Sequence, residues 1–149
     1  MKKFYWFGGS WVRGDELDKS IPVEKVHQNT FPYLVSEHYS AQCINMAENG
    51  SSVDTVLVNF SKIIDQADTD ATMFFCLPPL HRTSFFNDQG IQKNILPSGP
   101  ANSNRYHNRH EYSTMWYKYF DSESQQIYNR DRTINLLHLW CKDLKIRHY

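Results

Sequence analysis

The hydrophobic pattern opens with an apolar run at residues 4–7, which is followed by Gly8, Gly9 and Ser10. Because both faces of this run are apolar, it is typical of a strand buried in a parallel sheet. The glycines allow a sharp turn and a close approach by another group. They leave Ser10 at the carboxyl end of the strand, the edge where ligands bind in open α/β sheets. Gly-Gly-Ser alone is only a turn, so a functional role for Ser10 requires other segments to converge on it.

Polar residues predict a loop over 18–30, and a short helix is expected over 31–39. Thr30 is suited to cap this helix, and Pro32 falls in the first turn, where its missing N–H costs little. A second short strand is expected over 43–47.

The clearest amphipathic pattern predicts a helix over 53–67. Its apolar positions recur at spacings of three and four and form one stripe, with Phe60 at the centre. The stripe consists of Val53, Val56, Leu57, Phe60, Ile63, Ile64 and Ala67. Ser51 and Asp54 resemble a capping box at the start of this helix. A third, fully buried strand is expected over 71–77.

Turn-forming residues dominate 78–110, which predicts a long irregular loop of the kind that is usually functional or partly disordered. The pattern is helical again over 111–142, with a potential break at 121–124. Residues 144–149 have the character of a fourth strand.

Strands that alternate with helices predict a parallel sheet with right-handed crossovers. We therefore expect one α/β domain over 1–149, with a three-layer, flavodoxin-like architecture and strand order 2-1-3. In that order the turns at 9–11, 49–51 and 78–84 face one crevice.

Composition narrows the functional classes. The 16 basic and 16 acidic residues cancel, which predicts no general attraction to nucleic acid or to an anionic membrane. No apolar run reaches membrane-spanning length, and the chain enters its first strand without room for a secretory signal, so a cytoplasmic location is expected. Three cysteines without close spacing predict reduced, buried thiols rather than disulfides or a zinc site; they are Cys43, Cys76 and Cys141.

Two stretches resemble blocks of the SGNH/GDSL hydrolases. Gly8-Gly9-Ser10, followed by Gly14-Asp15-Glu16-Leu17, resembles the first block, with Gly9 in place of the usual Asp. Residues 31–34 followed by 45–52 are similar to the second block, whose glycine is Gly50. The resemblance covers roughly the first half of the chain and is nearest to SGNH-like proteins encoded by bacteriophages.

The resemblance implies a serine esterase or a carbohydrate deacetylase that needs no cofactor and no metal. Ser10 would attack an acyl carbonyl, and the N–H groups of Ser10 and Gly50 would stabilise the oxyanion. A histidine must take the serine proton. The implied substrate is a small acyl ester or an acetylated carbohydrate, and the implied location is the host cytoplasm or the phage particle.

The chain also departs from the family. Where the third block, Gly-x-Asn-Asp, is expected, the sequence reads Leu-Pro-Pro-Leu-His-Arg over 77–82. The Asp-x-x-His near the carboxyl end is missing, because Asp143 and His148 lack that spacing and His148 falls in the expected fourth strand. His81 is the first candidate for a substitute base, although a surface loop histidine is the simpler interpretation. Arg82 either holds an anionic substrate or is solvated.

The departures keep a second function class open: a catalytically silent SGNH-like domain that binds protein partners, for instance in a phage particle.

Other groups have simpler explanations than chemistry. Asp15 and Glu16 start a helix or line the crevice unless they form a glycosidase pair. His107 and His110 belong to a polar loop unless further metal ligands exist. The aromatic run at 112–120 is core or interface rather than a ligand platform.

Overall fold

The computed structural model describes residues 1–149 apart from 16, 19, 68–69, 80–81, 87–91 and 96–121. Its centre is a four-stranded sheet with the spatial order β2-β1-β3-β6. The strands are β1 (Lys3–Phe7), β2 (Gln42–Asn45), β3 (Ala71–Phe75) and β6 (Arg147–His148). All neighbouring strands in this sheet run parallel. The expected α/β class, the order 2-1-3 and the fourth strand are therefore confirmed.

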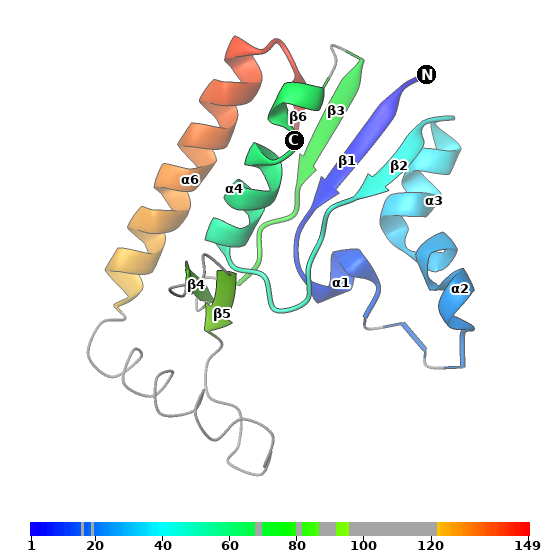
Figure 1. Ribbon diagram of the computed structural model, residues 1–149, viewed down its shortest axis with the longest axis horizontal. Helices are drawn as coiled ribbons and strands as arrows, with labels where there is room; N and C mark the ends of the chain where they lie inside the picture. Colours follow the sequence, from blue (N-terminus) through cyan, green and yellow to red (C-terminus); the bar gives the residue numbers. More distant parts are fainter. Residues whose placement is uncertain (16, 19, 68–69, 80–81, 87–91, 96–121) are drawn as a thin grey trace.

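Helices cover both faces of the sheet (Figure 1). One face carries α1 (Ser10–Arg13) and α3 (Phe31–His38), and the other carries α4 (Val53–Ser61) and α6 (Glu123–Asp143). In the described connections lie the short helices α2 (Val23–Val26), η1 (His27–Asn29) and η2 (Ile64–Gln66).

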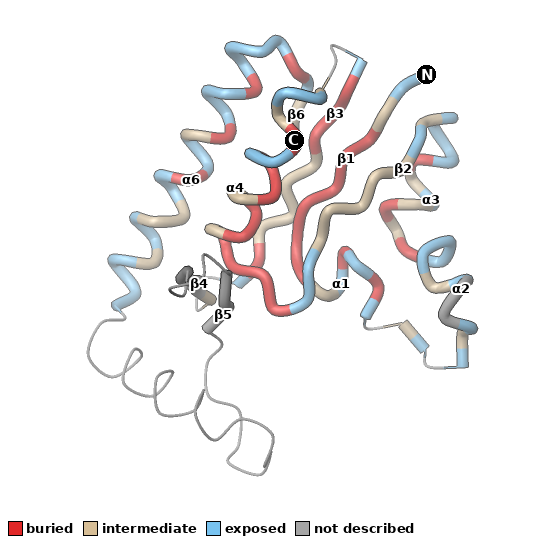
Figure 2. Tube along the Cα trace, viewed as in Figure 1, coloured by how far each residue is buried: buried red, intermediate tan, exposed pale blue. Residues whose placement is uncertain are grey.

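The central strand β1 supplies both halves of the core. Successive side chains of a strand point to opposite faces, so Tyr5 and Phe7 pack under α4 and α6, whereas Phe4 and Trp6 pack under α1 and α3. Figure 2 shows that burial is concentrated along β1 and β3. This two-sided burial explains why the run at 4–7 has no polar face.

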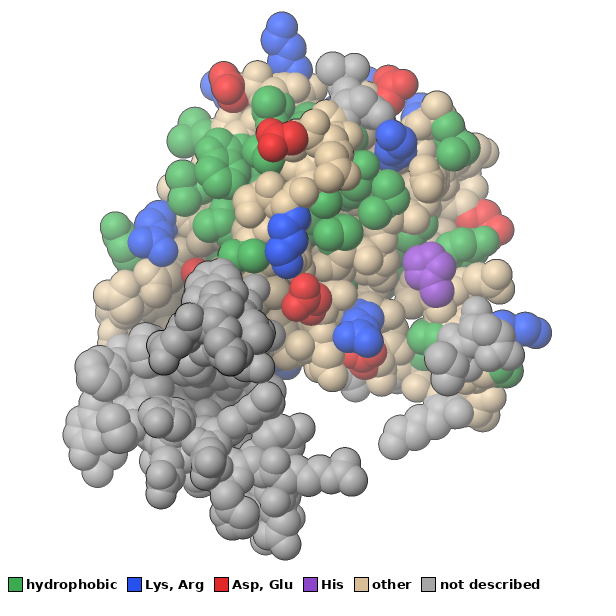
Figure 3. Space-filling model, in the orientation of Figure 1, with side chains coloured by type: hydrophobic (Ala, Val, Ile, Leu, Met, Phe, Trp, Pro, Cys, Tyr) green, Lys and Arg blue, Asp and Glu red, His purple; other side chains and the backbone are tan. Residues whose placement is uncertain are grey.

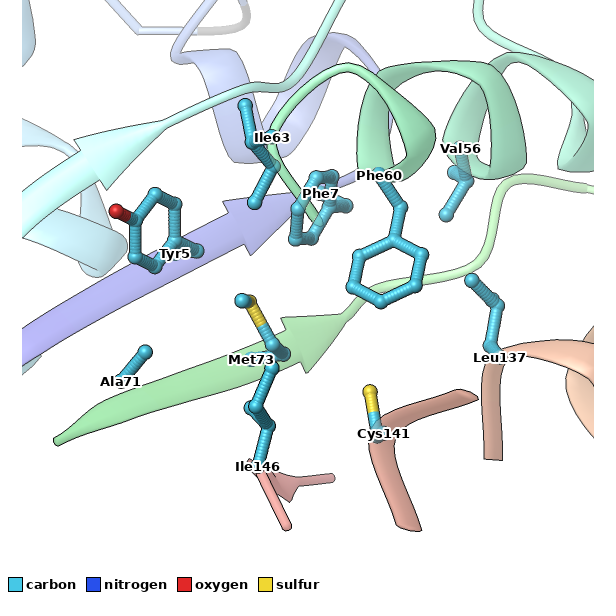
Figure 4. Packing of buried hydrophobic residues seen from close by; sticks show 10 residues of the cluster. All are labelled: Tyr5, Phe7, Val56, Phe60, Ile63, Ala71, Met73, Leu137, Cys141 and Ile146. Atoms are coloured by element: carbon cyan, nitrogen blue, oxygen red, sulfur yellow. The ribbon is translucent and has the colours of Figure 1, made fainter. Parts of the chain in front are cut away.

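Phe60 of α4 is fully buried at the centre of the first cluster (Figure 4). Its ring lies 5.9 Å from the ring of Phe7 and 5.5 Å from that of Phe75, both in edge-to-face geometry. Trp140 of α6 stacks over it at 5.9 Å. The predicted apolar stripe therefore faces the sheet, as its periodicity indicated.

The helix α3 is fixed to the opposite face by hydrogen bonds as well as by packing. Thr30 caps it, as expected, because its Oγ accepts a hydrogen bond from the Tyr33 N–H at 3.4 Å. The buried Trp6 Nε1–H donates to Ser36 Oγ at 3.1 Å, and the Ser36 hydroxyl donates to the Pro32 carbonyl at 2.7 Å. This chain of bonds satisfies the indole N–H in an apolar layer.

Three expectations were wrong in detail. The expected loop over 18–30 contains α2 and η1. The helix expected over 53–67 ends at Ser61, and Ile64 of its apolar stripe lies in η2, flanked by Ile63 and Ala67. The irregular stretch 78–110 contains an antiparallel hairpin of β4 (Thr83–Phe86) and β5 (Gln92–Ile95), which the turn-rich composition concealed.

The capping residues of α4 also differ from the expected pair. Ser52, rather than Ser51, is the N-cap, and its partner is Thr55, rather than Asp54. Ser52 Oγ accepts from the Thr55 N–H at 3.2 Å, and Thr55 Oγ1 accepts from the Ser52 N–H at 3.1 Å. Ser51 is thereby free for a different bond, described below.

The helix expected over 111–142 is seen from Glu123 onwards, with Ser122 as its N-cap, while its first part lies outside the described residues. None of the helices within the described ranges is long and apolar enough to cross a membrane. Basic and acidic side chains are interspersed over the face shown in Figure 3.

Replacing Phe60 by Ala should lower the free energy of unfolding by about 3–5 kcal/mol, because a large ring is removed from a closed cluster. The measurement is urea denaturation followed by circular dichroism. Leu34→Ala is the control, because Leu34 is 52% exposed and should change stability by less than about 0.5 kcal/mol. Equal midpoints and slopes for wild type and Phe60→Ala would show that α4 does not pack as described.

A second prediction concerns Cys141, which is buried in the same cluster. Burial raises the pKa of its thiol from 9.0 to about 11. In the unfolded chain the thiol loses its proton at lower pH than in the folded protein, so the unfolded state binds fewer protons and stability falls as pH rises from 9.0 towards about 11. Urea unfolding at about pH 8 and about pH 10.5 should show a smaller loss for Cys141→Ala than for wild type. An identical loss in both proteins would contradict the assignment.

Candidate functional site

The turns after β1, β2 and β3 meet at the carboxyl edge of the sheet, close to α1 (Figure 1). Gly8, which follows β1, contacts the segments that follow β2 and β3. Its carbonyl oxygen accepts hydrogen bonds from the Glu48 N–H at 3.1 Å and from the Ser51 hydroxyl at 2.8 Å. The Cys76 N–H, after β3, donates to the Phe7 carbonyl at 2.9 Å. Segments far apart in the sequence are therefore joined directly at the start of α1.

Gly8 is required by this close approach. A Cβ at position 8 would lie 2.5 Å from Val12 Cγ2 and 2.8 Å from the Cys76 carbonyl oxygen, which is too close for any side chain. Gly9 is different, because a Cβ there would make only ordinary contacts, the nearest being 3.4 Å from Arg82 Nη1. Its backbone, with φ of −97°, is also accessible to other residues.

Ser10 is the first residue of α1 and is half-buried. The α1 helix is a single turn. The Val12 and Arg13 N–H groups donate to the Gly9 carbonyl at 3.1 Å, and Gly14 ends the turn with a left-handed φ of 96°. Val12 is fully buried under the sheet and anchors the turn. The position of Ser10 is thus set by the two glycines before it and by Val12 after it.

The turn after β2 brings Gly50 to the same edge. Gly50 is buried, with a left-handed φ of 70° that favours glycine. Within the described part of the chain its N–H donates to no other group, which leaves a backbone donor at this edge. Ser51 next to it is fully buried, and its bond to Gly8 ties the turn to β1.

The turn after β3 contributes Arg82. Its N–H donates to the Pro79 carbonyl at 3.3 Å, and its Nη1 lies 3.4 Å from the Cβ position of Gly9. Three of the four residues singled out from the sequence, Ser10, Gly50 and Arg82, therefore lie in segments that converge around Gly8 and Gly9. The fourth, His81, lies outside the described residues.

An open cavity of about 590 Å³ lies against Trp11, the residue after Ser10. Its described walls come from α1, from the turn after β3 and from α6, and consist of Trp11, Leu77, Pro78, Pro79, Arg130 and Ile134. Trp11 is 51% exposed and stacks on Phe31, with ring centroids 5.2 Å apart. The contribution of α6 was not predicted from the sequence. Arg130 and Ile134 are four positions apart and therefore share one helix face, which is the signal that could have revealed it.

Other titratable groups have structural partners or lie elsewhere. His148 is in β6, as expected, and its Nε2 is 2.9 Å from Nδ1 of His138 on α6. Asp15 forms an ion pair with Arg13 at 3.4 Å. Burial raises the pKa of Cys76, so the thiol beside Gly8 stays protonated near neutral pH and is a poor nucleophile.

The prediction of three reduced, buried cysteines is confirmed in part. All three cysteines are free, but only Cys141 is buried, whereas Cys43 and Cys76 are half-buried. Among the described residues no group of three or more His, Cys, Asp or Glu side chains could hold a metal ion. The residues Glu16, His107, His110 and the run at 112–120 lie outside the described ranges.

Comparisons with protein-family models, with curated proteins and with solved structures found no match to this chain.

The contrast between the two glycines yields a prediction. Gly8→Ala should lower the free energy of unfolding by about 1–3 kcal/mol, because its Cβ overpacks against Val12 and the Cys76 carbonyl. Gly9→Ala is the matched control. It should be neutral or stabilising by up to about 1 kcal/mol, since the added methyl has room and restricts the unfolded chain. The measurement is urea denaturation of both variants. A Gly9→Ala protein that loses as much stability as Gly8→Ala would contradict the described turn.

Proposed function

We propose that this chain is a serine acyl hydrolase of SGNH type with a flavodoxin-like fold, in which Ser10 is the nucleophile. The observation that supports it best is the convergence of Ser10 with the Gly50 turn and with Arg82 at the carboxyl edge of a parallel sheet. A hydroxyl at a strand-to-helix turn beside a backbone donor is the arrangement that acyl transfer requires.

The proposed reaction has two balanced halves. Ser10 Oγ attacks the acyl carbon while its proton passes to a base, and the tetrahedral oxyanion accepts hydrogen bonds from the Ser10 and Gly50 N–H groups. The carbon–oxygen bond to the alcohol then breaks, and the base returns the proton to the leaving oxygen. Water repeats these steps on the acyl-serine and releases the acid. His81 is the proposed base, because it directly precedes Arg82 in the sequence.

The cavity lined by Trp11 supports an ester of moderate size as the substrate. Its walls are mainly apolar, with Trp11, Leu77, Pro78 and Ile134 available to the non-reacting part of the ester. Trp11 follows Ser10 in α1, so the cavity and the proposed nucleophile share this one-turn helix. A small acyl ester or an acetylated sugar fits these dimensions.

A second candidate, a catalytically silent binding domain of the same fold, is favoured by one observation. The turn after β3 carries Pro78 and Pro79, where the resemblance calls for an oxyanion asparagine. Proline has neither a backbone N–H nor a polar side chain, so this turn supplies no oxyanion donor at those positions. The same cavity would then bind a ligand or a protein segment, for example within a phage particle, without turnover.

The test is labelling by a fluorophosphonate probe together with turnover of p-nitrophenyl acetate. We expect slow but measurable activity that is abolished in Ser10→Ala and strongly reduced in His81→Ala. Removing one oxyanion donor from a serine hydrolase costs about 100-fold or more in kcat, which accounts for the low expected rate. Ser61→Ala is the control, because Ser61 is exposed at the far end of α4 and should retain full activity. Equal background rates for wild type and Ser10→Ala would reject the hydrolase and favour the binding domain.

A further inference from the structure

The space in front of Gly9 is an unfilled position among three side chains. A Cβ at residue 9 would lie 3.4 Å from Arg82 Nη1, 3.6 Å from Ser51 Oγ and 3.9 Å from Trp11 Cδ1. Since the backbone at Gly9 does not require glycine, the absence of a side chain there is not explained by conformation. Position 9 therefore leaves a gap the size of a Cβ between the backbone and Arg82, directly before Ser10.

The guanidinium of Arg82 is the charged wall of this gap. Arg82 is half-buried, and the part of the chain that the structure describes offers its side chain no ion-pair or hydrogen-bond partner. Arg130, which lines the cavity, is by contrast bound to Asp131 at 2.9 Å. Removing a cation from water without a partner costs free energy, so a partly buried, unpaired guanidinium favours a negatively charged ligand.

We propose that the ligand of the Ser10 site carries an oxyanion, such as a carboxylate or a phosphate, which binds to the Arg82 guanidinium beside Gly9. This proposal rests on the proposed function for the identity of the ligand as an ester, but the anion site itself does not depend on catalysis. The planar guanidinium matches a carboxylate or phosphate with two parallel hydrogen bonds. The cavity lined by Trp11, Pro78 and Ile134 then takes the apolar part of the same ligand.

The gap permits a test that needs no ligand. In Gly9→Asp the new carboxylate lies beside Arg82 and should pair with it, whereas Gly9→Asn has the same size without the charge. We expect Gly9→Asp to have a higher unfolding midpoint than Gly9→Asn, and we expect this difference to disappear when both changes are made in an Arg82→Gln background. Identical differences in the two backgrounds would show that Arg82 does not face the gap.

The second test uses two esters of similar length, monomethyl succinate and methyl butyrate, of which only the first is charged. Binding is measured by isothermal titration calorimetry with Ser10→Ala, so that no hydrolysis occurs. Monomethyl succinate should bind about 10-fold tighter or more than methyl butyrate, as expected for one charge-assisted interaction. The preference should survive Gly9→Ala, weaken in Arg82→Lys and vanish in Arg82→Gln and Gly9→Asp. Equal affinities for the two esters, or a preference that Arg82→Gln leaves intact, would overturn the proposal.

Hydrolysis of the same two esters, followed by pH-stat titration with Ser10 intact, separates this proposal from the proposed function. Turnover of both esters without a charge preference would reject the anion site and keep the hydrolase. Binding of monomethyl succinate that depends on Arg82, without turnover of either ester, would reject the hydrolase and keep the anion site.

Discussion

The close approach of three chain segments at Gly8 is the constraint on which the rest of the structure depends. Its carbonyl receives one hydrogen bond from the backbone and one from the buried Ser51 hydroxyl, while Val12 and the Cys76 carbonyl occupy the space of a side chain. Any residue other than glycine would push α1 away from the sheet. The position of Ser10, the depth of the Gly50 turn and the path of the chain after β3 are all set by this one contact.

The two-sided core explains why this contact can be so close. β1 lies between β2 and β3 and is covered by helices on both faces, so its backbone has no freedom to shift towards solvent. Phe7 packs against Phe60 on one face, and Trp6 stacks on Phe74 at 4.0 Å on the other. Aromatic pairs of this kind add to area burial and fix ring orientation. The residues that follow β1 at the sheet edge are therefore attached to a rigid strand.

Local patterns predicted most of the secondary structure and the order of the strands, but not the contacts made across long sequence distances. The continuous apolar run of β1, the cap at Thr30 and the stripe around Phe60 are short-range signals, and each is confirmed. The expected cap at Ser51 was wrong because its hydroxyl bonds instead to Gly8, which is distant in the sequence. The cavity wall on α6 was missed for the same reason. Convergence of the three turns was predictable because parallel strands end at one edge.

The chemistry available at this edge follows from which groups the turns do and do not supply. Prolines at 78 and 79 lack a backbone N–H, so in the proposed reaction the stabilisation of an oxyanion would fall to the N–H groups of Ser10 and Gly50. The guanidinium of Arg82, to which the described residues offer no partner, adds positive charge beside Gly9, directly before the serine turn. A charge placed there would orient an anionic ligand towards Ser10, so the proposed anion binding and the proposed nucleophile depend on the same two turns.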